Sequence, residues 1–180
     1  MTEIPAENLP PIWPGTRPTI PTVGDERAML TAMLDWHRAT FELKCADVPA
    51  ARLSEPSVPP SGLSLHGLLR HLAGVERWWF QQQFAGSDVP DLYYSDDDPD
   101  QDFERLDGDT TAALAVWRAE CESSRQVVAA TPSLNDLGVR QPNGKPIALR
   151  WVLLHLIAEY ARHNGHADLL RESLDGLTGV

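Results

Sequence analysis

Residues Leu154–Arg171, which read LHLIAEYARHNGHADLLR, decide the fold of this chain. Apolar side chains cover most of the circumference of the helix that this stretch predicts, so the helix is expected to face an interior. Four of its polar side chains share one side of this helix: His155, Glu159, His163 and His166. At roughly 100° per residue they fall within an arc of about 80°. Three imidazoles and a carboxylate on one stripe are costly to bury unless something binds them, and a divalent metal ion is the usual reason.

Three further segments have helical periodicity. They are expected from about Asp25 to Ala46, from Ser64 to about Phe84 and from about Thr110 to Ala130, while the last helix runs from near Ala148 to Asp175–Gly176. Four long amphipathic helices joined by polar loops predict an all-α fold, a four-helix bundle. We expect one domain over residues 23–176. An extended arm over residues 1–22, which hold six prolines, is expected to precede it.

The composition narrows the class of protein. With 180 residues, the chain is long enough for one domain with a substantial core. Its formal net charge of -11 argues against a surface for nucleic acid or an anionic membrane, because phosphates require clustered Lys and Arg. Cys45 and Cys121 form no CxxC motif and are expected to be buried thiols. The chain shows neither a signal-peptide pattern nor an apolar run of membrane-spanning length, so we expect a cytoplasmic protein.

The spacing of residues predicts a set of metal ligands. Glu159 and His163 are four residues apart, so their side chains lie one above the other on a helix and can reach one ion. The second helix offers His66 or His71 as a third ligand. His71 lies in the middle of the apolar stripe, whereas His66 shares its face with two arginines, so His71 is the one predicted to point inward. A lone histidine on an apolar face is more often a hydrogen-bonded core residue, and only the cluster on the last helix favours a ligand role.

Other polar residues are weaker candidates. His166 lies on the same face as the predicted ligands and could be a fourth ligand, a hydrogen-bonding partner of a ligand, or a pocket residue. His155 is expected to pack, and His37 is expected to be a core residue or to line a pocket. Asp168 and Arg171 lie at the end of the site, where we expect them to form salt bridges in preference to supporting the ligands.

The acidic residues 96–109 resemble a calcium site only in part. Asp98-x-Asp100-x-Asp102 matches the start of a calcium loop, but Phe103 replaces the required Gly and Asp109 stands where Glu is needed. A solvated acidic loop is therefore expected. The chain contains neither a GxSxG motif nor a Gly-rich phosphate loop, so a hydrolase triad and a nucleotide site have no support.

Two stretches together resemble the DinB-like superfamily, and in particular its actinobacterial branch of mycothiol-dependent transferases: SLHGLLRHLAGVERWWF (Ser64–Phe80) and LRWVLLHLIAEYARHNGHADLLRE (Leu149–Glu172). The resemblance extends from about residue 23 to residue 176. It implies a four-helix bundle in up-down-down-up order, often dimeric. It also implies a metal ion held by one His of the second helix and an H-x-x-x-H pair of the last.

Carried over by position, His71 matches the first of these ligands and His163 the last. Glu159 stands where the middle His is usual, which is similar to the mycothiol-dependent maleylpyruvate isomerases. The implied metal ligands are therefore His71, Glu159 and His163. If the pattern is shifted, His166 replaces Glu159.

The resemblance implies a metal-dependent S-transferase that joins a low-molecular-weight thiol, mycothiol, to an electrophilic small molecule. A divalent cation would favour the thiolate, which is the nucleophile. Zinc is the first expectation, with nickel, manganese or iron as alternatives. The implied partners are small molecules and a second copy of the chain, not nucleic acid or a membrane. Two other functions stay open: a non-catalytic metal-binding stress-response bundle, and a small-ligand binding module without metal.

Overall fold

A computed structural model of the chain describes residues 17–106 and 108–178. Apart from two isolated bridges, the regular secondary structure of these residues is helical. The helices are α1 (Glu26–Cys45), α2 (Ala50–Leu53), α3 (Leu65–Glu76), a π-helix (Arg77–Phe84), α4 (Gln101–Glu104), α5 (Thr110–Ala130), a 3₁₀ turn (Pro142–Gly144) and α6 (Leu149–Asp175). The predicted all-α class is confirmed. Residues 1–16 of the predicted arm lie outside the described residues, and residues 17–22 have no regular secondary structure.

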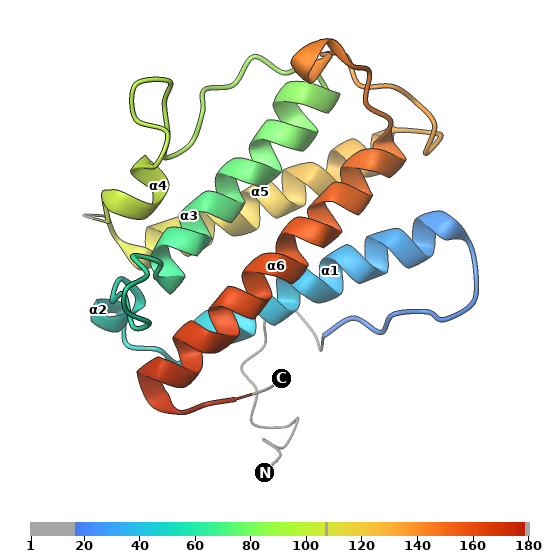
Figure 1. Cartoon of the computed structure of the whole chain (residues 1–180). Coiled ribbons are helices and arrows are strands. Elements are labelled where there is room, and N and C mark those ends of the chain that lie inside the picture. Colours follow the sequence, from blue (N-terminus) through green and yellow to red (C-terminus); the bar gives the residue numbers. More distant parts are fainter. Residues whose placement is uncertain (1–16, 107, 179–180) are drawn as a thin grey trace.

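The long helices pack side by side. α6 lies between α1 and α3, and α5 lies behind them in the view of Figure 1. α6 packs along α1 and against α3, and α3 packs along α5. The short α4 packs on α3, at the left-hand edge of the view in Figure 1. The up-down-down-up order stays a prediction.

Local capping sets the ends of the long helices. Asp25, Ser64 and Asp109 each place a side-chain oxygen on a backbone N–H in the first turn of α1, α3 and α5, which satisfies a donor that the helix leaves unpaired. Gly176, with a φ of 80°, ends α6 in a left-handed conformation that glycine adopts without steric penalty. The boundaries of α1, α5 and α6 therefore lie where the sequence predicts them.

The second long helix differs from the single α-helix predicted to end near Phe84. Its last eight residues form the π-helix, and beyond it the backbone N–H of Ala85 donates to the carbonyl oxygen of Phe80, five residues back, at 2.9 Å. An apolar period of 3.6 residues does not distinguish these geometries over so short a length. π-helical turns are frequent at functional sites, and this one contains Trp78 and Trp79.

All four long helices meet at one buried polar cluster, formed by Arg38 of α1, Glu76 of α3, Trp117 of α5 and Tyr160 of α6. The carboxylate of Glu76 accepts two hydrogen bonds from Arg38, at 2.7 and 2.6 Å, and one from the Tyr160 hydroxyl at 2.8 Å. The indole N–H of Trp117 donates to the Tyr160 oxygen at 2.9 Å. Because Tyr160 follows Glu159 in α6, the buried polar cluster fixes the rotation of α6 at the level of a predicted metal ligand.

Leucines supply much of the apolar core around this cluster. α3 and α6 bury Leu65, Leu68, Leu69, Leu72, Leu149, Leu153 and Leu156. Fully burying one leucine contributes roughly 1.5–3 kcal/mol, so these two helices are held together mainly by apolar contacts. Polar side chains that lie between α3 and α6 are therefore held by two tightly packed helices.

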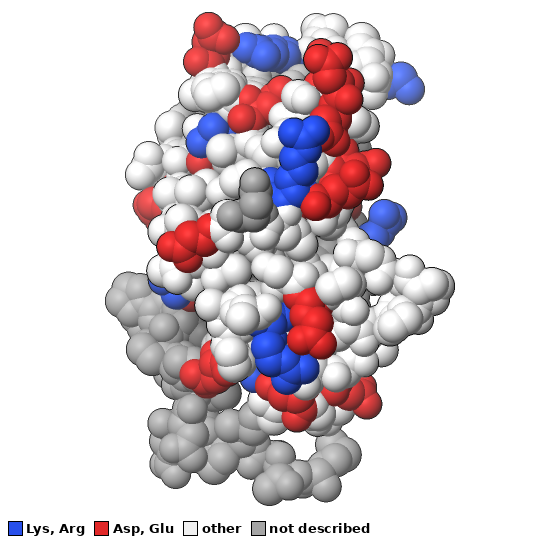
Figure 2. Space-filling view, turned by 90° about the vertical axis from the view of Figure 1, so that its left-hand side faces the viewer, with Lys and Arg blue, Asp and Glu red and all other residues white. Residues whose placement is uncertain are grey.

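The surface carries mixed charge. On the face shown in Figure 2, Lys and Arg side chains stand among acidic ones. Ion pairs between partly or fully exposed side chains include Arg52 with Glu55 at 3.1 Å and Arg105 with Asp98 at 2.5 Å. Within the described part of the chain, no helix is both long enough and apolar enough to span a bilayer.

Candidate metal centre

The structure brings together the three side chains that the sequence predicts as metal ligands. His71 comes from α3, and Glu159 and His163 come from successive turns of α6. Their candidate ligand atoms all lie within 4.8 Å of one another. Glu159 Oε1 accepts hydrogen bonds from Nε2 of His163 at 3.0 Å and from Nε2 of His71 at 3.3 Å. The two helices thus direct two nitrogens and one oxygen toward one point, and we call these three residues the His-Glu-His cluster.

This donor set fits a divalent metal ion. Imidazole nitrogens and a carboxylate oxygen bound at about 2.1 Å to a tetrahedral ion lie roughly 3.4 Å apart, close to the two nitrogen–oxygen separations of 3.0 and 3.3 Å within the cluster. The side chains of His71 and Glu159 are 23% and 19% exposed, so the cluster is accessible from one side. Among the described residues the group consists of three ligands, and three protein ligands are typical of catalytic sites, whereas structural sites are closed by four.

Asp102 supports His71 from outside the cluster. It is only 4% exposed, and its Oδ2 accepts a hydrogen bond from Nδ1 of His71 at 2.9 Å. The predicted solvated loop is wrong for this residue, because α4 packs on α3 and buries it. Gly67 permits that packing, since a Cβ there would lie 3.1 Å from the ring of Phe103. A carboxylate on the second nitrogen of a ligand imidazole fixes the ring and raises its basicity.

The Asp102→Asn variant tests this support. The amide keeps the size of the side chain but removes the charge that orients His71, so we expect the affinity for zinc to fall by about 10- to 100-fold. Competition with a chromophoric chelator measures the affinity. The control is Asp100→Asn, at an exposed position next to α4, which should change the affinity less than about two-fold because solvent screens its charge. Equal effects of the two substitutions would show that Asp102 does not act through His71.

His166 lies beside the cluster. His163 directs Nε2 toward Glu159, and its Nδ1 lies 3.3 Å from Nδ1 of His166, within hydrogen-bonding distance. Of the roles that the sequence leaves open for His166, this geometry favours a hydrogen-bonding partner of a ligand. Such a partner fixes the orientation of the ligand imidazole, as Asp102 does for His71.

Two other histidines have structural contacts. The sequence favours His71 over His66 as the inward-facing residue, yet His66 is only 1% exposed. Its Nδ1 lies 2.8 Å from the hydroxyl oxygen of Ser54, because the segment after α2 covers this face of α3. The backbone oxygen of His37 accepts a hydrogen bond from the side-chain amide of Asn164 at 3.1 Å. Neither histidine belongs to the His-Glu-His cluster.

Asp168 and Arg171 form salt bridges, as expected. Asp168 pairs with Lys44 at 2.5 Å, and Arg171 pairs with Asp175 at 2.8 Å. Arg171 also donates to backbone carbonyl oxygens at the end of α1, including that of Lys44 at 3.0 Å. The contacts to Lys44 and to the end of α1 hold α6 against α1. Neither Asp168 nor Arg171 belongs to the His-Glu-His cluster.

Hydrogen bonds set the charge of the metal-free cluster. Burial acts to lower the pKa of His71, but hydrogen bonds to Asp102 and Glu159 outweigh it and raise that pKa to about 9. Hydrogen bonds from His163 and His71 hold the pKa of the Glu159 carboxyl well below its usual range. The metal-free cluster therefore pairs a charged His71 with an ionised Glu159 at neutral pH. Metal binding must displace the proton of His71 and is favoured as the pH rises.

The metal-free protein should lose stability at alkaline pH. The pKa of His71 is raised from 6.5 to about 9 in the folded chain, so its charged form stabilises the fold fully below pH 6.5 and progressively less up to about pH 9. We expect the free energy of unfolding to fall over this window by on the order of 1–3 kcal/mol. Urea denaturation of chelator-treated protein at several pH values measures it. The His71→Ala variant should lack this fall, and an equal fall in that variant would contradict the assignment.

Neither cysteine supplies a reactive thiol. Cys45 and Cys121 are free and buried, as predicted. Burial raises the pKa of Cys45 to about 12 and that of Cys121 well above its usual range. Because the thiolate is the nucleophilic form, thiol chemistry at the cluster requires a thiol from outside the chain.

One cavity of the described structure adjoins the cluster, and a second lies away from it. A cavity of about 290 Å³ is lined by His71 and Asp102 together with aromatic side chains of the π-helix. The residues that line it thus include one predicted ligand and the carboxylate that supports it. A small molecule bound there would lie next to the His-Glu-His cluster.

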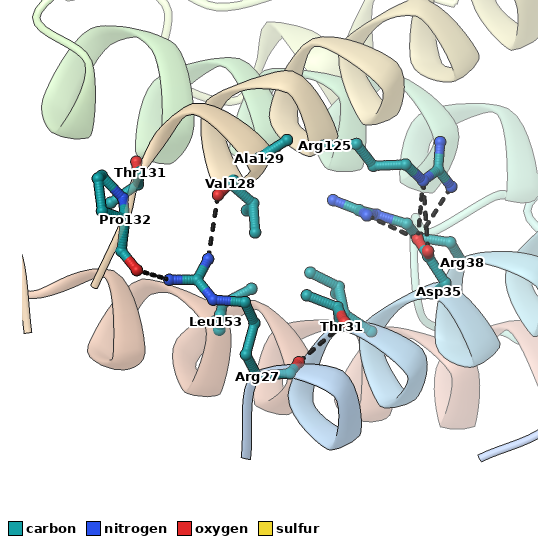
Figure 3. Close-up of a pocket in the computed structure, with 11 residues that line it drawn as sticks. Arg27, Thr31, Asp35, Arg38, Arg125, Val128, Ala129, Thr131, Pro132 and Leu153 are labelled. Carbon is teal, nitrogen blue, oxygen red and sulfur yellow. Dashed lines mark hydrogen bonds and ion pairs between the residues drawn. The ribbon is translucent and has the colours of Figure 1, made fainter. Parts of the chain in front are cut away.

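The other cavity, of about 400 Å³, lies between α1, α5 and α6 (Figure 3). At one end Arg27 donates to the backbone oxygens of Val128 and Pro132. At the other end Asp35 accepts hydrogen bonds from Arg38 and Arg125. The described residues that line it do not include the predicted ligands, so of these two cavities only the smaller one adjoins the cluster.

The pattern of the chain matches one known family. A family model for mycothiol-S-transferases matches residues 29–176. The chain belongs to the mycothiol-S-transferase family. This match covers the His-Glu-His cluster and nearly all of the four long helices, and it confirms the predicted mycothiol-transferase branch. Among curated proteins, none matches the chain.

Membership in the mycothiol-S-transferase family indicates a transferase at the level of the family, with mycothiol as the thiol. Because both cysteines of the chain are buried, a nucleophilic thiol has to come from a molecule outside the chain. Mycothiol is a thiol of this kind. Mycothiol-S-transferase membership and the accessible His-Glu-His cluster therefore point to the same chemistry.

Proposed function

We propose that this chain is a metal-dependent S-transferase that joins mycothiol to an electrophilic small molecule, with His71, Glu159 and His163 as the ligands of one divalent ion. The convergence of these side chains from α3 and α6, beside a cavity, carries the proposal. Three protein ligands leave a coordination position for a substrate. The proposal includes the predicted single bundle domain of residues 23–176, a homodimer and a cytoplasmic location.

A divalent ion at the cluster would lower the pKa of the thiol and so provide thiolate at neutral pH. The residues of the chain do the rest. Asp102 and His166 contact the second nitrogens of His71 and His163 and hold both rings with Nε2 toward the ion site. Glu159 contributes one negative charge, so the site is less positive than one built from three neutral histidines. Two nitrogens and one oxygen suit zinc first, with nickel, manganese or iron as alternatives.

The geometry supports the two other functions less well. A metal-free module that recognises anions needs unpaired positive charge, whereas carboxylates of Glu159 and Asp102 already accept hydrogen bonds from His71. A structural metal site is usually closed by four protein ligands, whereas the group found among the described residues has three. A cavity beside the cluster also favours a site that receives a substrate.

Removal and return of the metal tests the proposed function. Chelator-treated protein, before and after reloading with zinc, is mixed with mycothiol and either 1-chloro-2,4-dinitrobenzene or iodoacetamide, and loss of free thiol is followed. We expect transfer above the uncatalysed rate with zinc, at least about ten-fold slower transfer after chelation, and recovery on reloading. Equal rates with and without metal would contradict metal dependence. No transfer to either electrophile would contradict the transferase function.

A further inference from the structure

Aromatic rings line the cavity beside the His-Glu-His cluster. The cavity lies between α3 with its π-helical extension on one side and the loop of residues 91–100 with α4 on the other. Its lining includes the aromatic side chains of Trp78, Trp79 and Tyr94. His71 and Asp102 line it as well. The aromatic rings therefore surround a space that also reaches a predicted metal ligand.

Neighbouring rings hold the tryptophans in place. Trp78 and Trp79 meet edge to face with their centroids 4.3 Å apart. Trp79 also packs on Trp151 at 4.9 Å and on His155 at 4.6 Å. Those two rings of α6 stack on each other, with 6° between their planes. Walls that are already fixed lose little side-chain entropy on binding, and fixed ring faces favour flat ligands that can stack.

Gly74 lets the loop close over the cavity. A Cβ at Gly74 would lie 3.2 Å from the backbone oxygen of Leu92 and 3.4 Å from the ring of Tyr94. The hydroxyl of Tyr94 donates to Asp91 at 3.2 Å, which holds the ring. A glycine in a helix interior costs roughly 1 kcal/mol relative to alanine, and this close approach of the loop accounts for its presence.

Charge and size limit the ligand further. The described residues that line the cavity include neither Lys nor Arg, and Asp102 is their carboxylate. The lining therefore offers no guanidinium or ammonium group to pair with an anionic ligand, and the Asp102 carboxylate is already hydrogen-bonded to His71. The volume of about 290 Å³ is at the small end for ligand cavities and suits one or two fused rings.

We infer that this cavity binds the electrophile and that the electrophile is a neutral, planar aromatic molecule; the inference rests on the proposed transferase function. In the transfer, the thiol sulfur forms a bond to the electrophilic carbon, and the bond from that carbon to its leaving group breaks. The leaving group departs with the electron pair as an anion, and the thiol proton passes to solvent. Trp78 and Trp79 stack on the ring and hold its reactive carbon near the cluster.

Binding of two matched alcohols tests the inference without catalysis. Naphthalene-2-methanol and its decahydro counterpart share a carbon skeleton and a hydroxyl, but only the first is flat. Calorimetry with zinc-loaded protein should show the flat alcohol binding at least about ten-fold tighter, because stacking adds to burial. Trp78→Ala should weaken its binding at least about ten-fold, and Trp79→Phe, which keeps an aromatic wall, should retain the preference.

The matched control is Trp36→Ala. Trp36 lies on α1, where its ring contacts Arg17 and His37, and it is not among the described residues that line the cavity. Its affinity for the flat alcohol should stay within about two-fold of wild type. Equal affinities for the two alcohols, or equal losses in Trp78→Ala and Trp36→Ala, would overturn the inference.

Transfer rates separate this inference from the proposed function. In Trp78→Ala the ratio of the rates with 1-chloro-2,4-dinitrobenzene and iodoacetamide should fall at least about ten-fold. If neither electrophile is transferred but the flat alcohol binds selectively, the transferase function fails and the aromatic site stands. If transfer occurs and the ratio is the same in Trp78→Ala, the inference fails and the transferase function stands.

Discussion

We expect the His163→Ala variant to lose nearly all metal-dependent thiol transfer, with a rate at least about 100-fold below that of the wild type. His163 is one of two imidazoles in the cluster, and its Nε2 lies 3.0 Å from Glu159 Oε1. Without it, one nitrogen and one oxygen are left for the ion, which is too few to hold it firmly. The rate of mycothiol consumption at saturating zinc measures the loss.

Two further variants make this loss specific. His166→Ala removes only the contact to the second nitrogen of His163, so we expect an intermediate loss of about 10-fold. Arg162→Ala changes an exposed residue on the same turn of α6 and should leave the rate within about two-fold of wild type. Circular dichroism checks that each variant is folded. A folded His163→Ala variant with a rate near that of Arg162→Ala would contradict the role of the cluster.

The Glu76→Gln variant should be strongly destabilising. Glu76 is fully buried and accepts hydrogen bonds from Arg38 and Tyr160. The amide removes the buried counter-charge of the Arg38 guanidinium and leaves it only the partly exposed carboxylate of Asp35. We therefore expect the free energy of unfolding to fall by about 3 kcal/mol, the low end for a broken buried ion pair. Urea denaturation followed by circular dichroism measures the change.

Two controls separate burial from loss of charge. Glu122→Gln removes a carboxylate that is 59% exposed and lies 3.3 Å from Arg125, so it should cost less than about 1 kcal/mol. The double variant Arg38→Met with Glu76→Leu removes both charges, so no buried ion is left unpaired, and it should regain part of the loss. Equal costs for Glu76→Gln and Glu122→Gln would show that the buried polar cluster does not hold the helices together.

The sequence predicts the His-Glu-His cluster well because its geometry is mostly local. Glu159 and His163 belong to one helix, where a spacing of four residues places them on one face. Predicting His71 as the third member requires one further step, which is to decide which face of the second helix points inward. The ends of α1, α5 and α6 are predictable for the same reason, since capping depends on neighbouring residues.

Contacts between distant segments escape prediction. Asp102 lies 31 residues from His71 in sequence, and only the packing of α4 on α3 brings the two together. His66 is buried because Ser54, from a Pro-rich connection without clear periodicity, covers it. The change from α to π geometry after Glu76 depends on backbone hydrogen bonds that the apolar pattern does not specify. The aromatic cavity likewise requires the loop of residues 91–100 to fold back on Gly74.

Elemental analysis of the purified protein, without a polyhistidine tag, tests the metal centre most directly. We predict about one divalent ion per chain in the wild type and loss of that ion in both His71→Ala and His163→Ala. Because these histidines come from α3 and α6, loss in both variants places the ion between the two helices. A wild-type protein that holds no divalent ion, even after incubation with zinc, would contradict the metal-dependent transferase function.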